Sequence, residues 1–175
     1  SGGIDSPVAA HAVMTRGSDI TPLYFYNKPF AAGDHIGRME SVLRKLRRFH
    51  PGKDWYYYLV DMEPINTKLL EIDAGRMLLH RAVMFGVASH FVRENNLSGI
   101  VTGESIGQKS SQTTANLHIS SRAAQEPIFR PLLTVQKDEV IERAKELGTF
   151  EDAVVNSACK SLAPTPPATH LSQSR

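Results

Sequence analysis

The stretch SGGIDSPVAA, at residues 1–10, decides the fold that this sequence predicts. Gly2 and Gly3 can adopt backbone conformations that are closed to other residues, so backbone N–H groups there can approach an anion closely. The apolar residues that begin at Pro7 predict a helix, and the partially positive N-terminus of that helix faces the same anion. The stretch therefore predicts a phosphate-binding loop. The alternative is an ordinary glycine turn before a surface helix.

Three polar side chains complete this predicted loop. Ser1 and Ser6 supply hydroxyl donors. The negative charge of Asp5 would repel a phosphate group. A magnesium ion, or the helix N-terminus that Asp5 caps, can compensate this charge, and the expected ligand is therefore a metal-bound nucleotide. The loop lacks the terminal lysine and the third glycine of two common nucleotide-binding motifs. SGGIDS instead resembles the loop of pyrophosphatases that split ATP between its α and β phosphates.

The composition predicts one globular domain with a hydrophobic core, because 41% of the 175 residues are hydrophobic, 22% are charged and the net charge is +2. The most apolar stretch, residues 77–92, contains His80, Arg81 and His90 and is too short to span a bilayer, so no membrane partner is expected. The one cysteine, Cys159, excludes a disulfide within this chain and favours a reducing cytoplasm. No spacing of cysteine and histidine predicts a zinc site.

Apolar runs alternate with amphipathic ones along the chain. Helical spacing predicts helices over residues 7–16, 34–49, 74–95 and 137–147. Apolar and β-branched runs predict strands over residues 20–26, 55–60, 99–102 and 128–129. Strands separated by helices favour an α/β fold: a doubly wound parallel sheet with helices on both faces. A ligand of such a sheet binds at the carboxyl ends of the strands, here near Tyr26, Thr102 and Arg130.

A phosphate loop of this kind normally follows a buried central strand, and no strand precedes Ser1. We therefore expect the first strand of the sheet to be missing from an N-terminally truncated chain. That strand would belong in the middle of the sheet.

Three further motifs carry polar chemistry. The segment from Val101 to Leu117, which contains TGESIGQKSSQT at residues 102–113, predicts a polar rim that can read a base or a ribose; the alternative is a solvated loop. Lys137 begins a predicted helix, where a lysine opposes the helix dipole, so it either has an anionic partner or faces solvent beside the acidic residues that follow it. Cys159 stands next to a lysine, which favours the reactive thiolate.

Taken together, SGGIDSPVAA, TGESIGQKSSQT, FRPL before a lysine-led helix, and a last cysteine before PTPPAT resemble the tRNA 4-thiouridine synthetase family. This family of tRNA uracil 4-sulfurtransferases is also linked to thiazole formation in thiamine biosynthesis. The resemblance implies an adenine nucleotide alpha-hydrolase-like domain over residues 1–150 that uses ATP and Mg²⁺. It also implies that residues 151–175 form a tail that carries the sulfur-relay cysteine.

The resemblance also implies the reaction and its partners. The enzyme adenylates O4 of a tRNA uridine, releases pyrophosphate and introduces persulfide sulfur to give 4-thiouridine. A cysteine desulfurase or a rhodanese-type donor supplies the persulfide. An N-terminal domain outside this chain captures the tRNA, and a homodimer is a possible assembly.

Individual residues receive roles from the same resemblance. Lys137 acts at the reacting phosphates together with Asp5, and Cys159 relays sulfur. Relatives often have a cysteine pair at this point, whereas Ala158 precedes Cys159 here, so another domain, subunit or external thiol must resolve the persulfide. The nucleotide-binding residues are Ser1, Gly2, Gly3, Asp5, Ser6, Tyr24, Phe25, Arg81, Gly103, Gln112 and Arg130.

Two other functions stay open on the sequence. One is another adenylating enzyme with the same loop, of the amidotransferase type, and the other is a non-catalytic ATP-binding fragment. The basic helix residues are expected either to contact tRNA phosphates or to form a solvated face. These residues are Arg38, Arg44, Lys45, Arg47 and Arg48.

Overall fold

The computed structural model describes residues 3–27, 34–51, 55–72, 74–108 and 112–153. The helices are α1 (Asp5–Met14), α2 (His35–Arg47), α3 (Glu63–Leu69), α4 (Arg76–Glu94), α5 (Thr114–Ser121), α6 (Lys137–Glu146) and α7 (Phe150–Ala153). The strands are β1 (Leu23–Tyr26), β2 (Tyr58–Asp61), β3 (Ile100–Val101) and β4 (Ile128–Phe129). In the part of the chain described, no helix has the length and apolarity that a membrane span needs.

The strands pair in parallel, as the alternation of strands and helices predicts. β1 pairs with β2, with Leu23 opposite Tyr58, and β3 pairs with β4, with Ile100 opposite Ile128. Within the described ranges these pairs are two separate two-stranded sheets, and no strand hydrogen-bonds to both. The missing central strand stays a prediction.

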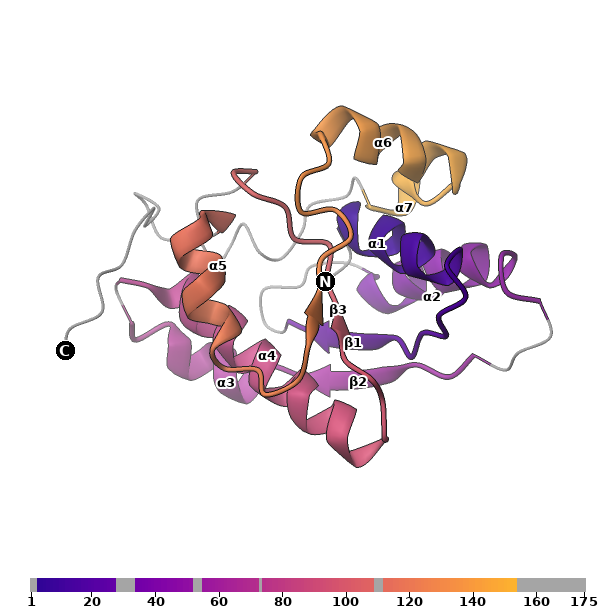
Figure 1. Cartoon of the computed structure of the whole chain (residues 1–175). Coiled ribbons are helices and arrows are strands. Elements are labelled where there is room, and N and C mark those ends of the chain that lie inside the picture. Colours follow the sequence, from indigo (N-terminus) through magenta and orange to yellow (C-terminus); the bar gives the residue numbers. More distant parts are fainter. Residues whose placement is uncertain (1–2, 28–33, 52–54, 73, 109–111, 154–175) are drawn as a thin grey trace.

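Helices cover the strands from two sides. Figure 1 shows α1, α2, α6 and α7 together on one side of the strands and α3, α4 and α5 on the other. Contacts between elements follow the same division, since α1 packs on α6, α2 on α7, and α4 on both α3 and α5. The predicted α/β architecture with helices on both faces is therefore confirmed.

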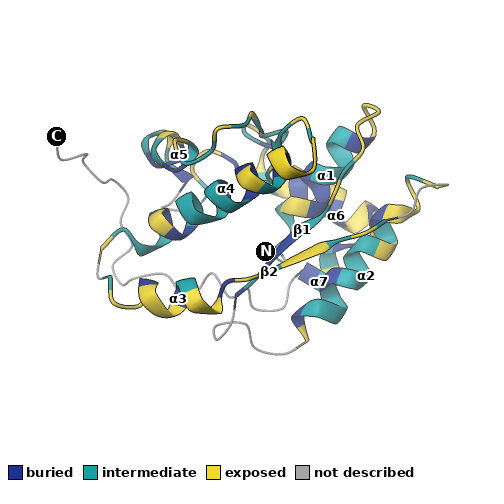
Figure 2. Ribbon diagram, turned by 90° about the horizontal axis from the view of Figure 1, so that it is seen from below, coloured by how far each residue is buried: buried dark blue, intermediate teal, exposed yellow. Residues whose placement is uncertain are grey.

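Two hydrophobic clusters hold these layers together. The first includes Val8 of α1, Leu46 of α2 and Val140 of α6, and the second includes Phe25 of β1 and Met62. Figure 2 shows buried and half-buried residues along α1, with Val8, Ala9 and Met14 among the buried ones, whereas β2 is mostly exposed. Because α1 is held on several sides, its N-terminus has a fixed place beside the strand ends.

Several element boundaries differ from the predicted ones. α1 begins at Asp5 rather than at Pro7, because a proline is tolerated within the first helical turn. The N-cap position is Ile4, and no side chain caps the helix, so the idea that Asp5 caps it is wrong. The strand predicted over residues 20–26 is shorter and begins at Leu23.

Sequence analysis missed α3, α5 and α7. α5 begins inside the predicted polar rim, where Thr113 is the N-cap and its hydroxyl accepts a hydrogen bond from the Asn116 backbone N–H at 3.2 Å. Threonine is one of the residues preferred at the N-cap position, so Thr113 is itself a signal that a helix begins. The last part of the predicted rim, from Thr114 onward, is therefore helical.

Candidate nucleotide-binding site

The described part of the phosphate loop lies at the N-terminus of α1. Gly3 precedes the helix, and Asp5 and Ser6 are in its first turn. Ser1 and Gly2 lie outside the described residues. The helix therefore presents its first backbone N–H groups where the sequence predicts an anion.

Gly103 brings the segment after β3 against this loop. A Cβ atom added at Gly103 would lie 2.6 Å from the carbonyl carbon of Asp5 and 2.7 Å from the backbone nitrogen of Ser6. Both neighbours are backbone atoms, which cannot move aside as a flexible side chain can. Only a glycine fits at this position, because the two backbones approach each other so closely. Gly103 therefore lets the TGESIGQ segment contact the phosphate loop.

Lys137 and Asp5 meet at the same place. The Lys137 ammonium lies 2.5 Å from Asp5 Oδ1, and its side chain remains 40% exposed. Lys137 is the first residue of α6 and Asp5 the first of α1, so both helix N-termini converge on the ion pair. The anionic partner expected for Lys137 is thus Asp5 in this structure. An ammonium in this position can also reach a nucleotide phosphate at the loop.

Glu104 lies between the two arginines of the predicted site. Its carboxylate is buried and accepts hydrogen bonds from Arg81 and, at 2.8 Å, from Arg130 Nε. Thr102 donates a further hydrogen bond to it at 3.2 Å. Arg130, which directly follows β4, also donates to the Ser121 hydroxyl of α5 at 2.6 Å. The two guanidiniums carry one more charge than Glu104 balances, so the cluster retains a positive charge beside the loop.

Gln112 is buried beside this cluster. In the amide orientation that satisfies both ends, its oxygen accepts from Arg81 at 3.1 Å and its nitrogen donates to the Ser105 carbonyl at 3.0 Å. Gln112 therefore orients Arg81 and supports the segment that follows Gly103. The sequence predicted Arg81, Gln112 and Arg130 as nucleotide contacts but gave no sign that Glu104 holds both arginines.

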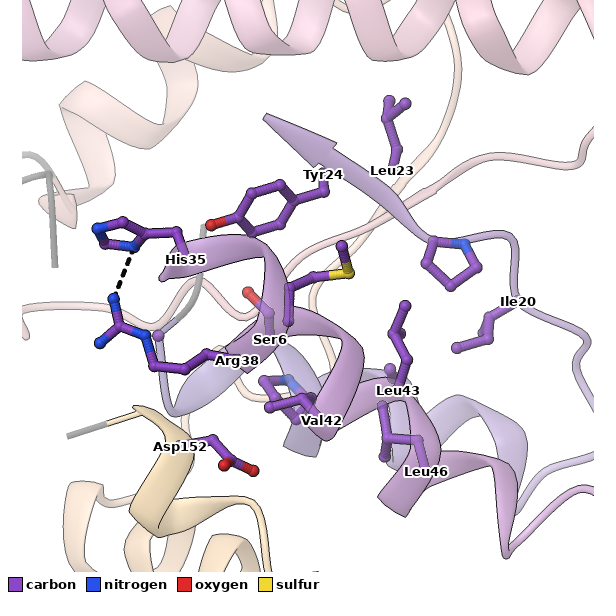
Figure 3. Close-up of a pocket in the computed structure, with 15 residues that line it drawn as sticks. Ser6, Ile20, Leu23, Tyr24, His35, Arg38, Val42, Leu43, Leu46 and Asp152 are labelled. Carbon is purple, nitrogen blue, oxygen red and sulfur yellow. Dashed lines mark hydrogen bonds between the residues drawn. The ribbon is translucent and has the colours of Figure 1, made fainter. Parts of the chain in front are cut away.

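A pocket extends from the phosphate loop between α1, β1 and α2. It is a cavity of about 140 Å³ with Gly3, Ser6 and Tyr24 at the loop. The deeper walls are apolar, formed by Ala10, Ile20, Pro22, Val42 and Leu43. Figure 3 shows the Tyr24 ring beside His35, while Leu43 and Ile20 line the far part. Cavities of about this size bind one small aromatic ring.

Tyr24 and Phe25 lie on opposite sides of β1, because side chains alternate along a strand. Tyr24 lines the pocket, whereas Phe25 packs with Met62 and Ala88 in the second hydrophobic cluster. The structure therefore brings Tyr24 to the predicted nucleotide site but not Phe25.

A buried polar network ends β1. The Asn27 side-chain oxygen accepts hydrogen bonds from His80 Nε2 at 3.1 Å and from Asn66 at 3.5 Å. Burial and then the neighbouring Arg81 charge lower the pKa of His80 to about 4, so this imidazole is neutral at pH 7. Sequence analysis missed this network, since an asparagine at a strand end carries no pattern that names its partners.

The remaining predicted residue, Cys159, lies outside the described residues. Within the described ranges, no group of three or more histidine, cysteine, aspartate or glutamate side chains gathers as metal ligands do.

The parallel α/β fold, with a glycine before α1 and polar residues at the strand ends, is the fold of the pyrophosphatase-loop class of proteins. The sequence matches, over residues 1–175, the family described as thiamine biosynthesis protein (ThiI). The chain belongs to this family.

Curated relatives agree with that assignment. A probable tRNA sulfurtransferase of Halobacterium salinarum is 41% identical over 170 residues, which cover 97% of this chain and 43% of that protein. One of Thermus thermophilus is 33% identical over 173 residues, covering 97% and 42%. The chain thus spans less than half the length of these relatives.

Solved structures agree on the fold. A crystal structure of a 4-thiouridine synthetase in complex with RNA and ATP matches with a TM-score of 0.88 and 33% identity, covering 97% of this chain and 45% of that one. The NMN synthetase from Francisella tularensis matches with a TM-score of 0.60 at 16% identity, covering 91% and 64%. The second likeness concerns the fold alone.

Proposed function

We propose that this chain is the ATP-using catalytic part of a tRNA sulfurtransferase that converts a uridine to 4-thiouridine. The observation that carries the proposal is the meeting of Lys137 and Asp5 at the phosphate loop, beside the pocket lined by Tyr24. Membership of the family and the likeness to a synthetase described with bound ATP and RNA support it.

ATP would lie with its phosphates on the N-terminus of α1 and its base in the pocket. The loop supplies backbone N–H donors and the Ser6 hydroxyl to phosphate oxygens. The Tyr24 ring and the apolar walls offer a planar base a hydrophobic surface. The positive charge left over at Arg81 and Arg130 favours an anion near the same strand ends.

The residues present fit a magnesium ion carried by the nucleotide. Mg²⁺ in nucleotide sites is bound by one or two carboxylates together with substrate phosphates, and Asp5 supplies such a carboxylate at the loop. The ion would neutralise phosphate charge. Binding of Mg²⁺ to Asp5 would also release Lys137 to donate to a phosphate oxygen.

The first chemical step activates the uridine. Its O4 oxygen attacks the α-phosphorus of ATP, the bond from that phosphorus to the bridging oxygen breaks, and pyrophosphate leaves with the electron pair. Negative charge builds on phosphate oxygens in this step. Lys137 and the loop N–H groups stabilise that charge, and losing one such donor typically costs about 2.7 to 4 kcal/mol.

The second step brings in sulfur. The terminal sulfur of a persulfide on Cys159 forms a bond to C4, and the C4–O4 bond breaks to release AMP. A second thiol then attacks the Cys159 sulfur, which frees the 4-thiouridine and leaves Cys159 in a disulfide with that thiol. Because Ala158 precedes Cys159, the second thiol comes from another domain, another subunit or an external thiol.

The proposal includes partners and a compartment. A cysteine desulfurase or a rhodanese-type donor loads the persulfide, and an N-terminal domain of the full-length protein captures the tRNA. The protein works in the cytoplasm, as a monomer or a homodimer, and the same persulfide can supply sulfur for the thiamine thiazole.

The test uses full-length protein with tRNA, MgATP and a persulfide donor, and it measures pyrophosphate and thiolated uridine. We expect Asp5→Ala and Lys137→Ala to lose both products, whereas Cys159→Ser loses thiolation and keeps pyrophosphate release. Ammonia incorporation that is indifferent to Cys159→Ser would support an amidotransferase-type enzyme instead. ATP binding without pyrophosphate release by the wild type would support a non-catalytic module.

A further inference from the structure

Two consecutive residues of α4 hold the carboxyl ends of two different sheets. His80 Nε2 donates a hydrogen bond at 3.1 Å to the side-chain oxygen of Asn27, which directly follows β1. Arg81 donates to the carboxylate of Glu104, which lies shortly after β3. The β1–β2 and β3–β4 sheets share no hydrogen-bonded strand within the described ranges. This turn of α4 is therefore a side-chain link between the two sheets.

Each sheet carries a different half of the nucleotide site. Tyr24 of β1 lines the pocket that is proposed for the base. Gly103 and Glu104 follow β3, and an added Cβ at Gly103 would lie 2.6 Å from the carbonyl carbon of Asp5, so this segment belongs with the phosphate loop. A nucleotide has to contact both halves at once. The spacing between the halves must therefore match the length of the nucleotide.

The hydrogen bond to Asn27 lies next to an apolar interface. Val83 and Met84 of α4 pack against the cluster that contains Phe25 of β1. Apolar packing is not directional, so by itself it does not fix one position of the helix along the strand. His80 and Asn27 are only 2% and 5% exposed, and a shift of α4 would leave their polar atoms buried without a partner. The hydrogen bond thus selects one position of α4 relative to β1.

Asn27 is also held from two other directions. Its side-chain nitrogen donates to the Phe25 carbonyl oxygen at 3.3 Å, and its side-chain oxygen accepts from Asn66 of α3 at 3.5 Å. Asn66 is fully buried. Rotation of the Asn27 side chain away from His80 would break these contacts as well. The acceptor for His80 is therefore fixed in place.

We propose that His80 and Asn27 are positioning residues for ATP, which set the distance between the base pocket beside β1 and the phosphate-binding residues around Arg81. The inference rests on the proposed function, because that function places the base in the pocket and the phosphates on the loop. Neither of these two described residues lines the pocket, so both act through Tyr24 and Arg81.

The test compares ATP with its two fragments in the full-length protein. Adenosine can occupy only the base half and magnesium tripolyphosphate only the phosphate half, whereas MgATP spans both. Equilibrium dialysis measures the binding of all three ligands and needs no turnover. Misplacement by about 1 Å can cost up to about 100-fold, so we expect His80→Leu to weaken MgATP binding by about ten-fold or more. The affinity for each fragment should stay near that of the wild type.

The fragment comparison can overturn the inference in two ways. If His80→Leu weakens the binding of adenosine or tripolyphosphate as much as that of MgATP, the variant damages one half rather than the spacing between the halves. If His80→Leu binds MgATP as tightly as the wild type does, the hydrogen bond sets no spacing. A wild-type protein that binds no MgATP would instead contradict the proposed function itself.

Two matched variants separate positioning from a general loss of stability. His80→Gln keeps an N–H donor for Asn27, so its MgATP affinity should stay close to that of the wild type. Ser89→Ala removes another buried hydrogen bond of α4, which the Gln125 backbone N–H donates to the Ser89 hydroxyl at 2.9 Å. Ser89→Ala should unfold at lower urea concentration and still bind MgATP normally. A loss of MgATP affinity in Ser89→Ala equal to that in His80→Leu would overturn the inference.

A double variant gives an independent decision. Asn27→Leu combined with His80→Leu removes both partners, and apolar replacement of both partners can be nearly neutral for stability. We expect the double variant to recover free energy of unfolding relative to His80→Leu but not to recover MgATP affinity, because no directional contact sets the spacing. Recovery of both would overturn the inference. If the double variant does not fold, the contrast between His80→Leu and His80→Gln still decides.

Discussion

The Lys137 ammonium lies 2.5 Å from the Asp5 carboxylate, which joins the first residue of α6 to the first residue of α1. Two groups of opposite charge thus stand together at the phosphate loop, where each N-terminus already favours an anion. We expect MgATP to replace this pairing, with the metal on Asp5 and a phosphate on Lys137.

Lys137→Met should therefore impair catalysis more than binding. Loss of one donor to the charge that builds in the transition state typically lowers kcat by about 10² to 10³. We expect the KM for ATP to change far less, because several other donors still hold the phosphates. Steady-state pyrophosphate release measures both constants. Lys145→Met, which removes an exposed lysine of the same helix, is the control.

Gly103→Ala should disrupt the junction between the β3 segment and the phosphate loop. The added Cβ would lie 2.6 Å from a backbone carbon of Asp5, and overpacking of this kind costs about 1–3 kcal/mol. We expect a lower free energy of unfolding in urea and weaker MgATP binding.

Gly86→Ala is the matched control for this variant. A Cβ there would lie 3.9 Å from the Ala123 carbonyl oxygen, an ordinary van der Waals contact, and alanine favours a helix interior. Its stability should equal or exceed that of the wild type. Equal effects of the two substitutions would contradict the close-approach argument.

Glu104→Gln should be strongly destabilising. The change leaves two half-buried guanidiniums without the countercharge of the buried Glu104, and breaking a fully buried pair in this way typically costs about 3–5 kcal/mol, which is an upper bound here. Glu139→Gln removes the carboxylate of an exposed pair with Arg143 and should cost less than about 1 kcal/mol. Urea unfolding of both variants checks the contrast, and a similar loss in each would show that the cluster contributes little.

His80 should make stability depend on pH. Its pKa is about 4 in the folded protein and about 6.5 when unfolded, so the unfolded state binds more protons between these values. The contribution is complete above pH 6.5 and is lost as the pH falls toward 4. This linkage predicts a loss of about 2 kcal/mol between pH 7 and pH 5.

Comparison with His80→Gln isolates this effect. The variant has no imidazole to titrate, so its free energy of unfolding should fall less over the same pH interval, although it is less stable at pH 7. Parallel pH profiles for the two proteins would contradict the assignment.

The sequence predicted the strand at residues 128–129 and the position of Lys137 at a helix start, and the structure confirms both. Such local signals depend on a few adjacent residues. The sequence could not reveal that Asp5 faces Lys137, because 132 positions separate them. It also could not show that Phe25 turns into the core while Tyr24 faces the pocket, since both are aromatic residues of one strand.

Missed elements have a similar cause. α5 is rich in polar residues, which are typical of a loop, and its helical state depends on the Thr113 cap and on packing against α4. The roles of Arg81 and Arg130 depend on Glu104, which tertiary contacts place between them. Local patterns thus indicate which residues are available for chemistry, and long-range packing decides how they are paired.

The most direct test of the account is isothermal titration of MgATP into the full-length protein. We expect saturable binding at one site per chain, and we expect this binding to weaken in Asp5→Ala. Absence of binding heat with the wild-type protein, over a temperature range wide enough to exclude cancellation of the enthalpy, would contradict it.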